Sequence, residues 1–143
     1  MSCKSAIYTA NTSSTALTIT TATTPVTIPL GTTIRRFGNN IQLSGSGILV
    51  EGQGYYDIDA NVTLTPVTAG AYTVTLYSDG APVPGATQTV TAAANASTTF
   101  NIPAVVRNQC CSSSKTLTLG VTTTAAVPAT LTVNNVGVVV EKI

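Results

Sequence analysis

The side chains with the most potential for chemistry are the carboxylates of Asp57 and Asp59, which are separated by one apolar residue. On a β-strand two such residues point to the same side, about 7 Å apart. A carboxylate pair at that spacing could cleave a glycosidic bond or bind a calcium ion. A solvated strand face explains the same pattern, and we favour this second interpretation.

The sequence contains no histidine and no tryptophan. Without histidine it lacks the most common general base and metal ligand, and it cannot build a Ser-His-Asp or Cys-His arrangement. The glycines between residues 45 and 54 precede no helix and no Lys-Ser or Lys-Thr pair, so they do not form a phosphate-binding loop. We therefore expect no catalytic residue, no metal and no cofactor, and a protein that is not an enzyme.

The three cysteines are Cys3, Cys110 and Cys111. An odd number of cysteines, in a chain whose first residues lack the pattern of a signal peptide, favours reduced thiols. Adjacent cysteines seldom bond to one another without strain. The alternative is a thiol staple, in which Cys3 reaches Cys110 or Cys111 of the same or a neighbouring subunit.

Only 8% of the 143 residues are charged, against about 25% in an average soluble protein, and the net charge is +1. Nucleic-acid binding relies on clustered Lys and Arg, and only Arg35 and Arg36 are adjacent, so we expect no nucleic-acid partner. No apolar run approaches the roughly 20 residues of a membrane helix, so we expect no membrane contact. A weakly charged chain with positive mean hydropathy is prone to associate, which favours an oligomer.

The most regular pattern runs from Gly54 to Pro66, where apolar and polar residues alternate. Alternation with a period of two predicts a strand with one buried and one solvated face. The same period recurs in shorter segments rich in Val, Ile and Thr, the last of them at Ala129 to Val133 and at Gly137 to Ile143. About ten strands separated by turn residues predict an all-β fold, an antiparallel β-sandwich or jelly roll.

Two segments depart from this regular pattern. The segment from Pro82 to Gly85 is predicted to be a rigid loop or a sheet edge, because proline has no N–H to donate to a ladder. Residues 1–15 are assigned to an N-terminal arm, with disorder of its first dozen or so residues as an alternative. Residues 16–143 are assigned to the jelly-roll domain.

Several short segments carry a resemblance to a known family. These are residues 48–51, 54–58, 74–77, 79–80, 83–85 and 138–143. Together they resemble the C-terminal domain of the BclA-type exosporium glycoproteins, which belong to the complement and tumour-necrosis-factor-like (TNF-like) jelly rolls. In that family a central strand has the pattern G-x-Y-x-I/V, matched here by Gly54, Tyr56 and Ile58. The resemblance implies a TNF-like jelly roll that forms a homotrimer.

The inner faces of the predicted strands are expected to form the core of the domain or the seam of the trimer. The residues concerned are Tyr56, Ile58, Val62, Leu64, Val74, Leu76, Leu117, Leu119, Val138 and Val140. Tyr55 alternates with Tyr56 and should therefore point outward, toward solvent, a partner subunit or a ligand. The BclA-type proteins carry a collagen-like Gly-X-Y stalk, and no such repeat occurs in this sequence.

A second resemblance rests on residues 2–8 and 34–38, which are similar to short proteins of tailed phages and prophages of gut Firmicutes. Such proteins are regarded as structural components of the virion. The resemblance implies a trimeric capsid decoration or head-fibre protein, assembled in the bacterial cytoplasm, that binds and stabilises a shell of major capsid protein. Arg35, Arg36 and Phe37 are the expected partner contacts, although an exposed loop explains them as well.

Two other functions remain open at this point. The first is a structural protein of a spore or cell surface, of the BclA kind. The second is a carbohydrate-binding jelly-roll module, which would need an aromatic platform from the seven Tyr and Phe residues of the chain.

Overall fold

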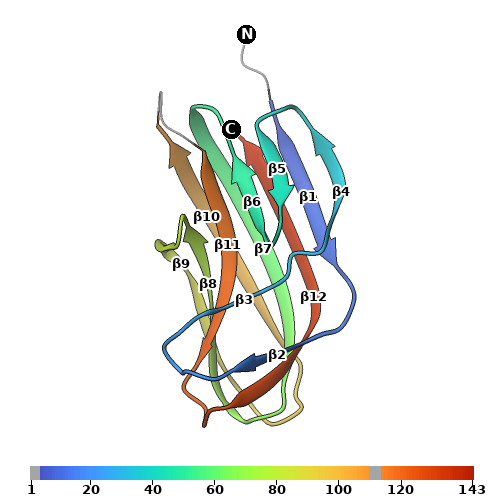
Figure 1. Ribbon diagram of the computed structural model, residues 1–143, viewed down its shortest axis with the longest axis vertical. Coiled ribbons are helices and arrows are strands. Elements are labelled where there is room, and N and C mark those ends of the chain that lie inside the picture. The colour runs from blue at the N-terminus through green and yellow to red at the C-terminus, as the bar shows by residue number, and fades with distance from the viewer. Residues whose placement is uncertain (1–3, 110–113) are drawn as a thin grey trace.

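The computed structural model describes residues 4–109 and 114–143, so Cys3, Cys110 and Cys111 lie outside the described residues. The chain forms two antiparallel sheets that pack face to face as an elongated sandwich (Figure 1). Both described ends of the chain lie at the same end of this sandwich. The predicted all-β antiparallel sandwich is confirmed.

Sheet A contains the first and last strands, β1 and β12, and the two longest strands, β7 and β12. Its order is β10 (Thr98–Asn108), β7 (Gly54–Pro66), β12 (Ala129–Lys142), β1 (Ala6–Asn11) and β4 (Thr32–Phe37), and β2 (Thr15–Ile19) pairs with the first half of β12. A register shift between Val133 and Asn135 leaves β12 continuous, although the sequence predicted two separate strands there. Such a bulge inserts an extra residue without ending the strand.

Sheet B covers the opposite side of the core. Its order is β5 (Ile41–Ser44), β6 (Gly47–Val50), β11 (Lys115–Thr123), β8 (Gly70–Ser78) and β9 (Ala81–Ala92), and β3 (Val26–Thr27) pairs with β11. The segment from Pro82 to Gly85 begins β9, the edge strand of this sheet, which agrees with the predicted edge position. Proline is tolerated there because an edge strand pairs on one side only.

The core lies between the two sheets and is built from the alternating apolar residues. The ten residues predicted for the core or the trimer seam are at most 3% exposed. Their side chains pack inside a single chain, so none of them is available on the surface. Each strand places them inward at every second position, as β7 does with Tyr56, Ile58, Val62 and Leu64.

Within the segment assigned to an N-terminal arm, Ala6–Asn11 form β1, which lies in sheet A between β12 and β4. The inward side chains of β1 are Ile7, Thr9 and Asn11, all buried. Two of the three are polar, so the apolar alternation that marks the long strands such as β7 is missing here. The Asn11 amide donates a hydrogen bond to the Pro29 carbonyl at 3.2 Å, which compensates for its burial.

The hydroxyl of Thr9 is the one buried side-chain oxygen without a hydrogen-bond partner within residues 4–109 and 114–143. Because Val has nearly the same shape and no group to desolvate, we expect Thr9→Val to raise the free energy of unfolding by about 1 kcal/mol. Urea unfolding measures the change. The control is Thr75→Val, which removes a hydroxyl that lies 2.9 Å from Thr87 on the surface and should give no gain. A Thr9→Val protein less stable than the unmodified chain would contradict this account.

Two buried tyrosines tie loops to the core at opposite ends of the sandwich. The Tyr56 hydroxyl lies 2.5 Å from the Glu51 carbonyl and 2.9 Å from the Gly52 carbonyl, in the turn between β6 and β7. The Tyr72 hydroxyl donates to the Thr68 carbonyl at 2.6 Å, in the turn between β7 and β8. Each phenol satisfies loop carbonyls while its ring fills the core.

The same two phenols make stability depend on alkaline pH. Burial raises the pKa of the Tyr56 phenol, and the charge of Glu51 raises it further. Burial also raises the pKa of the Tyr72 phenol, partly offset by a hydrogen bond to Thr123. Above the ordinary value of 10.0 the unfolded chain releases protons that the folded chain keeps, so stability is full below pH 10 and falls as pH rises further.

We therefore expect the urea midpoint to be unchanged between about pH 7 and about pH 9 and to fall at about pH 11. In Tyr72→Phe the urea midpoint should fall less between about pH 9 and about pH 11, because one of the two titrating phenols is absent. A midpoint of Tyr72→Phe that falls as steeply as that of the unmodified chain would contradict the assignment.

Candidate functional site

The outer face of sheet A gathers the large apolar side chains that the fold leaves exposed. They are Tyr8 on β1, Phe37 on β4, Tyr55 on β7, Val105 on β10, Val139 on β12 and Ile143 beside them, each 40–74% exposed. The other exposed large apolar residues among those described are Ile34 on β4 and, in loops, Val67 and Val127, so none lies on sheet B. Clusters of exposed apolar side chains are the usual candidates for interaction sites, so this face is the candidate site.

Strand register arranges this face in rows. One row runs Phe37, Ala6, Glu141, Asp57 and Val105, and the next runs Arg35, Tyr8, Val139, Asp59 and Pro103. Tyr8 and Val139 are direct cross-strand neighbours at the centre of this face. Apolar and charged side chains are thus mixed on this face, with Tyr8 and Val139 between Arg35 on one side and Asp59 on the other.

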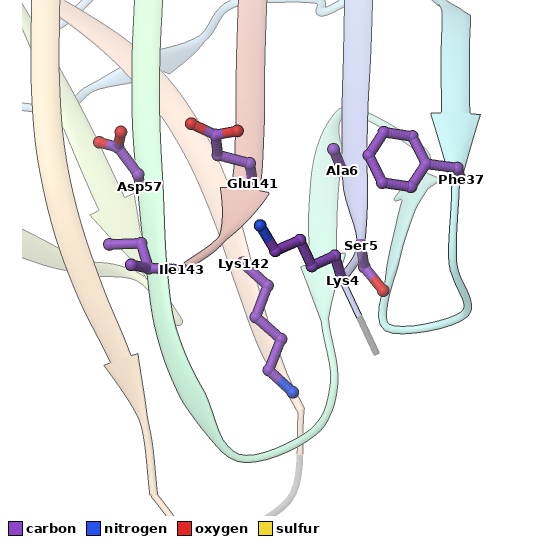
Figure 2. Close-up of a pocket in the computed structure, with 8 residues that line it drawn as sticks. All are labelled: Lys4, Ser5, Ala6, Phe37, Asp57, Glu141, Lys142 and Ile143. Atoms are coloured by element: carbon purple, nitrogen blue, oxygen red, sulfur yellow. The ribbon is translucent and has the colours of Figure 1, made fainter. Parts of the chain in front are cut away.

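Three of the five carboxylates of the chain lie on this face, and they are Asp57, Asp59 and Glu141. Figure 2 shows the Asp57 and Glu141 carboxylates pointing to the same side of the sheet, while the Lys142 side chain points away from them. Like charges directly opposite one another destabilise a strand pair. Lys4 lines the same pocket of about 330 Å³ as these two carboxylates, so a cation of this chain lies on the same face. In the part of the chain that the structure describes, no three acidic, cysteine or histidine residues group as metal ligands.

The expected partner contacts Arg35, Arg36 and Phe37 lie on β4, the edge strand of sheet A, and all three are exposed. Arg35 and Phe37 line a shallow hollow of about 120 Å³ with Tyr8 and Val139. Arg36 differs, because its Nε donates to the Ile41 carbonyl at 2.6 Å and so links β4 to β5. We use the name "sheet A patch" for Tyr8, Phe37 and Val139 with the carboxylates Asp57, Asp59 and Glu141.

A second surface lies at the edge where β9 of sheet B meets β10 of sheet A. It is a groove of about 400 Å³, here called the edge groove. Its lining includes Pro82, Val83, Val105, Arg107 and Lys115, and no carboxylate among the described residues. The edge groove is therefore apolar and basic, whereas the sheet A patch is apolar and acidic.

A further hollow of about 350 Å³ lies on the outer face of sheet A, next to Gly137. It is lined by Tyr8, Asp59, Val139 and the asparagines Asn61, Asn101 and Asn135. The Asn61 amide donates to the Asn101 side-chain oxygen at 3.1 Å, so two of these amides already satisfy one another in part. This hollow overlaps the sheet A patch, because Tyr8, Asp59 and Val139 belong to both.

No protein-family model and no curated protein matches this sequence. Several solved structures are similar to this chain. The chain is similar to the PRD1 vertex protein P5, with a TM-score of 0.61 and 15% identity over 96% of this chain and 72% of that chain. It is similar to murine APRIL, with a TM-score of 0.61 and 14% identity over 99% and 100%. It is also similar to Eiger TNF from S. frugiperda, with a TM-score of 0.62 and 10% identity over 97% and 91%.

Identities this low show the fold alone, and the fold is the predicted TNF-like jelly roll. The three neighbours are structural or cytokine proteins rather than enzymes. The resemblance to BclA-type proteins and to Firmicutes phage proteins finds no support from families or sequence relatives. Within residues 4–109 and 114–143, no helix has the length and apolar character needed to cross a membrane.

Proposed function

We propose that this chain is a homotrimeric structural protein of a phage virion, a capsid decoration or head-fibre protein that binds the shell and stabilises it. The observation that carries the proposal is the exposed apolar face of sheet A in a TNF-like jelly roll. TNF-like and vertex-protein neighbours are typically trimers, which supports the threefold assembly. A phage vertex protein among the structural neighbours supports the virion.

The trimer forms when the sheet A patch of one copy packs against the edge groove of the next. The patch supplies Tyr8, Phe37 and Val139 with carboxylates, and the groove supplies Val83 with the cations of Arg107 and Lys115. Opposite charges then meet across a contact whose centre is apolar. Because patch and groove are different surfaces of one chain, the contact is head-to-tail, and such contacts close into a ring when the rotation between neighbours is a whole fraction of a turn, here one third. In this arrangement Arg35 and Phe37 contact the neighbouring subunit.

The trimer would act on a capsid by binding alone. Trimers match the threefold and quasi-threefold positions of an icosahedral shell, where one trimer holds three neighbouring subunits of the major capsid protein. A ligand that binds only the assembled shell stabilises it by mass action, by about 2.7 kcal/mol when its concentration is 100 times the dissociation constant. No cofactor, nucleic acid or membrane is required for this mechanism.

The virion location is tested by fractionating a lysate of the source cells on a density gradient and detecting the chain with an antibody. We expect the chain in the band of intact phage particles, at a fixed ratio to the major capsid protein. Recovery with purified spores instead would favour a surface protein of the BclA kind. Recovery only as free protein would overturn the structural role.

A further inference from the structure

The outer face of sheet B differs from that of sheet A because its three longest strands present uncharged side chains. The outward residues are Thr73, Thr75 and Tyr77 on β8, Thr87, Thr89 and Thr91 on β9, and Thr118, Gly120 and Thr122 on β11. Threonine hydroxyls pair across the strands, 2.7 Å apart for Thr73 and Thr89. If sheet A forms the trimer contact, this threonine-rich face is the exterior of the assembly.

One hollow interrupts this face, and an aromatic ring forms its wall. It has a volume of about 160 Å³ and is lined by Tyr77, Pro25, Gly120, Thr27 and Thr118 among others. A Cβ atom on Gly120 would lie 2.8 Å from Cε2 of Tyr77 and 3.0 Å from Cβ of Pro25. The side chains of Tyr77 and Pro25 therefore both approach the backbone of Gly120. Any residue with a Cβ atom at position 120 would collide with them.

The register shows that this arrangement draws on three strands of sheet B. Gly120 of β11 pairs with Thr27 of β3 on one side and with Thr75 of β8 on the other. Thr118, two residues before Gly120, pairs with Tyr77. Hydroxyl groups from neighbouring strands thus border the tyrosine ring.

The chemistry of the hollow selects a class of ligand. A tyrosine ring and a proline ring offer apolar surface, and the hydroxyls of Thr27 and Thr118 both donate and accept hydrogen bonds. Within residues 4–109 and 114–143 no charged side chain lines the hollow, so it offers no charged partner to a phosphate or a carboxylate ligand. Sugars combine C–H faces that stack on aromatic rings with hydroxyls that exchange hydrogen bonds with Thr. Drug-sized ligands occupy pockets of about 300 Å³ or more, so this hollow has room for a single ring.

We propose that the hollow at Tyr77 binds one neutral sugar residue of a surface glycan. Tyr77 supplies the stacking surface, Pro25 the opposite wall, and Thr27 and Thr118 the polar contacts. The site does not depend on the trimer. A role of the site in attachment does rest on the proposed function. Three copies of the site on one particle would bind a glycan surface more tightly than a single weak site does.

The test is saturation-transfer NMR with glucose, galactose, mannose and N-acetylglucosamine as free probes at millimolar concentration. We expect transfer to at least one of these sugars from the unmodified chain. Tyr77→Ala should weaken binding at least about tenfold, whereas Tyr77→Phe, which keeps the ring, should retain it. Thr89→Ala, on the same face outside the hollow, is the matched control and should also retain binding. Far-UV circular dichroism checks that each variant is folded.

Three outcomes would overturn the inference. One is no transfer to any of the four sugars. Another is binding that is equally strong in a folded Tyr77→Ala protein. The last is binding that survives Tyr77→Ala and is lost in Tyr8→Ala, which would move the site to the hollow beside Gly137 on sheet A. Light scattering on the same samples tests the trimer separately. A monomer that binds sugar through Tyr77 would support the sugar site and contradict the proposed trimer.

Discussion

Val139→Arg is expected to convert the trimer into a folded monomer. Val139 lies at the centre of the outer face of sheet A, 41% exposed, with Tyr8 on one neighbouring strand and Asp59 on the other. In the monomer an arginine at this position reaches solvent and the Asp59 carboxylate, so the fold is unaffected. In the trimer the same guanidinium is removed from water in an apolar contact. We expect a cost of at least about 3 kcal/mol, or more than 100-fold in the dissociation constant.

The matched control places the same side chain on the other sheet. Thr89 is exposed on the outer face of β9, so Thr89→Arg adds an equal charge outside the proposed contact. Light scattering should give three chains for Thr89→Arg and one chain for Val139→Arg, with the same circular dichroism spectrum. Dissociation of both variants would show that charge in general weakens the assembly. A Val139→Arg protein that stays trimeric would show that the outer face of sheet A does not form the contact.

Gly31→Ala is expected to destabilise the fold more than any other glycine substitution proposed from this structure. Gly31 precedes β4 and has a φ of +83°, in the left-handed region that favours glycine. A Cβ at this position would lie 2.2 Å from the Ala10 carbonyl oxygen and 2.7 Å from the Cα of Asn11. Both atoms belong to the backbone of β1 and cannot move aside cheaply. The position of β4, and with it Arg35 and Phe37, depends on this close approach.

Gly85 separates the steric effect from the conformational one. It has nearly the same φ, +80°, and a Cβ added to it would have no atom within 4 Å. Gly85→Ala should therefore cost about 1 kcal/mol from backbone conformation, whereas Gly31→Ala should cost more than about 3 kcal/mol. Urea unfolding of both variants gives the difference. Equal losses would show that β1 and β4 separate easily at Gly31.

Strand positions were predictable wherever one face is apolar and the other polar. The strand β7 follows that pattern over its full length, and its residues Tyr56 and Ile58 are buried as alternation requires. The strand β1 was not predicted because two of its three buried side chains, Thr9 and Asn11, are polar. The strand β4 is exposed at every position, so its sequence holds no inward pattern and its place is set by pairing with β1.

The candidate surface could be predicted only in part. Val138, Val139 and Val140 are consecutive, and since strand neighbours face opposite sides, one of the three had to be exposed. Which residues join Val139 could not be predicted, because the register between β12, β1 and β7 depends on strands far apart in the chain. For the same reason the sequence did not distinguish Arg36, which donates to the Ile41 carbonyl, from Arg35, which lies beside Tyr8 on the outer face of sheet A.

The central claim is tested most directly by the mass of the full-length chain in dilute buffer, measured by light scattering with and without a reducing agent. We predict a mass of three chains in both conditions, because strand faces and edges hold the subunits together. A mass of one chain would contradict the trimer. A trimer that dissociates only on reduction would also contradict the proposed contact, because the assembly would then depend on Cys3, Cys110 or Cys111 rather than on sheet A.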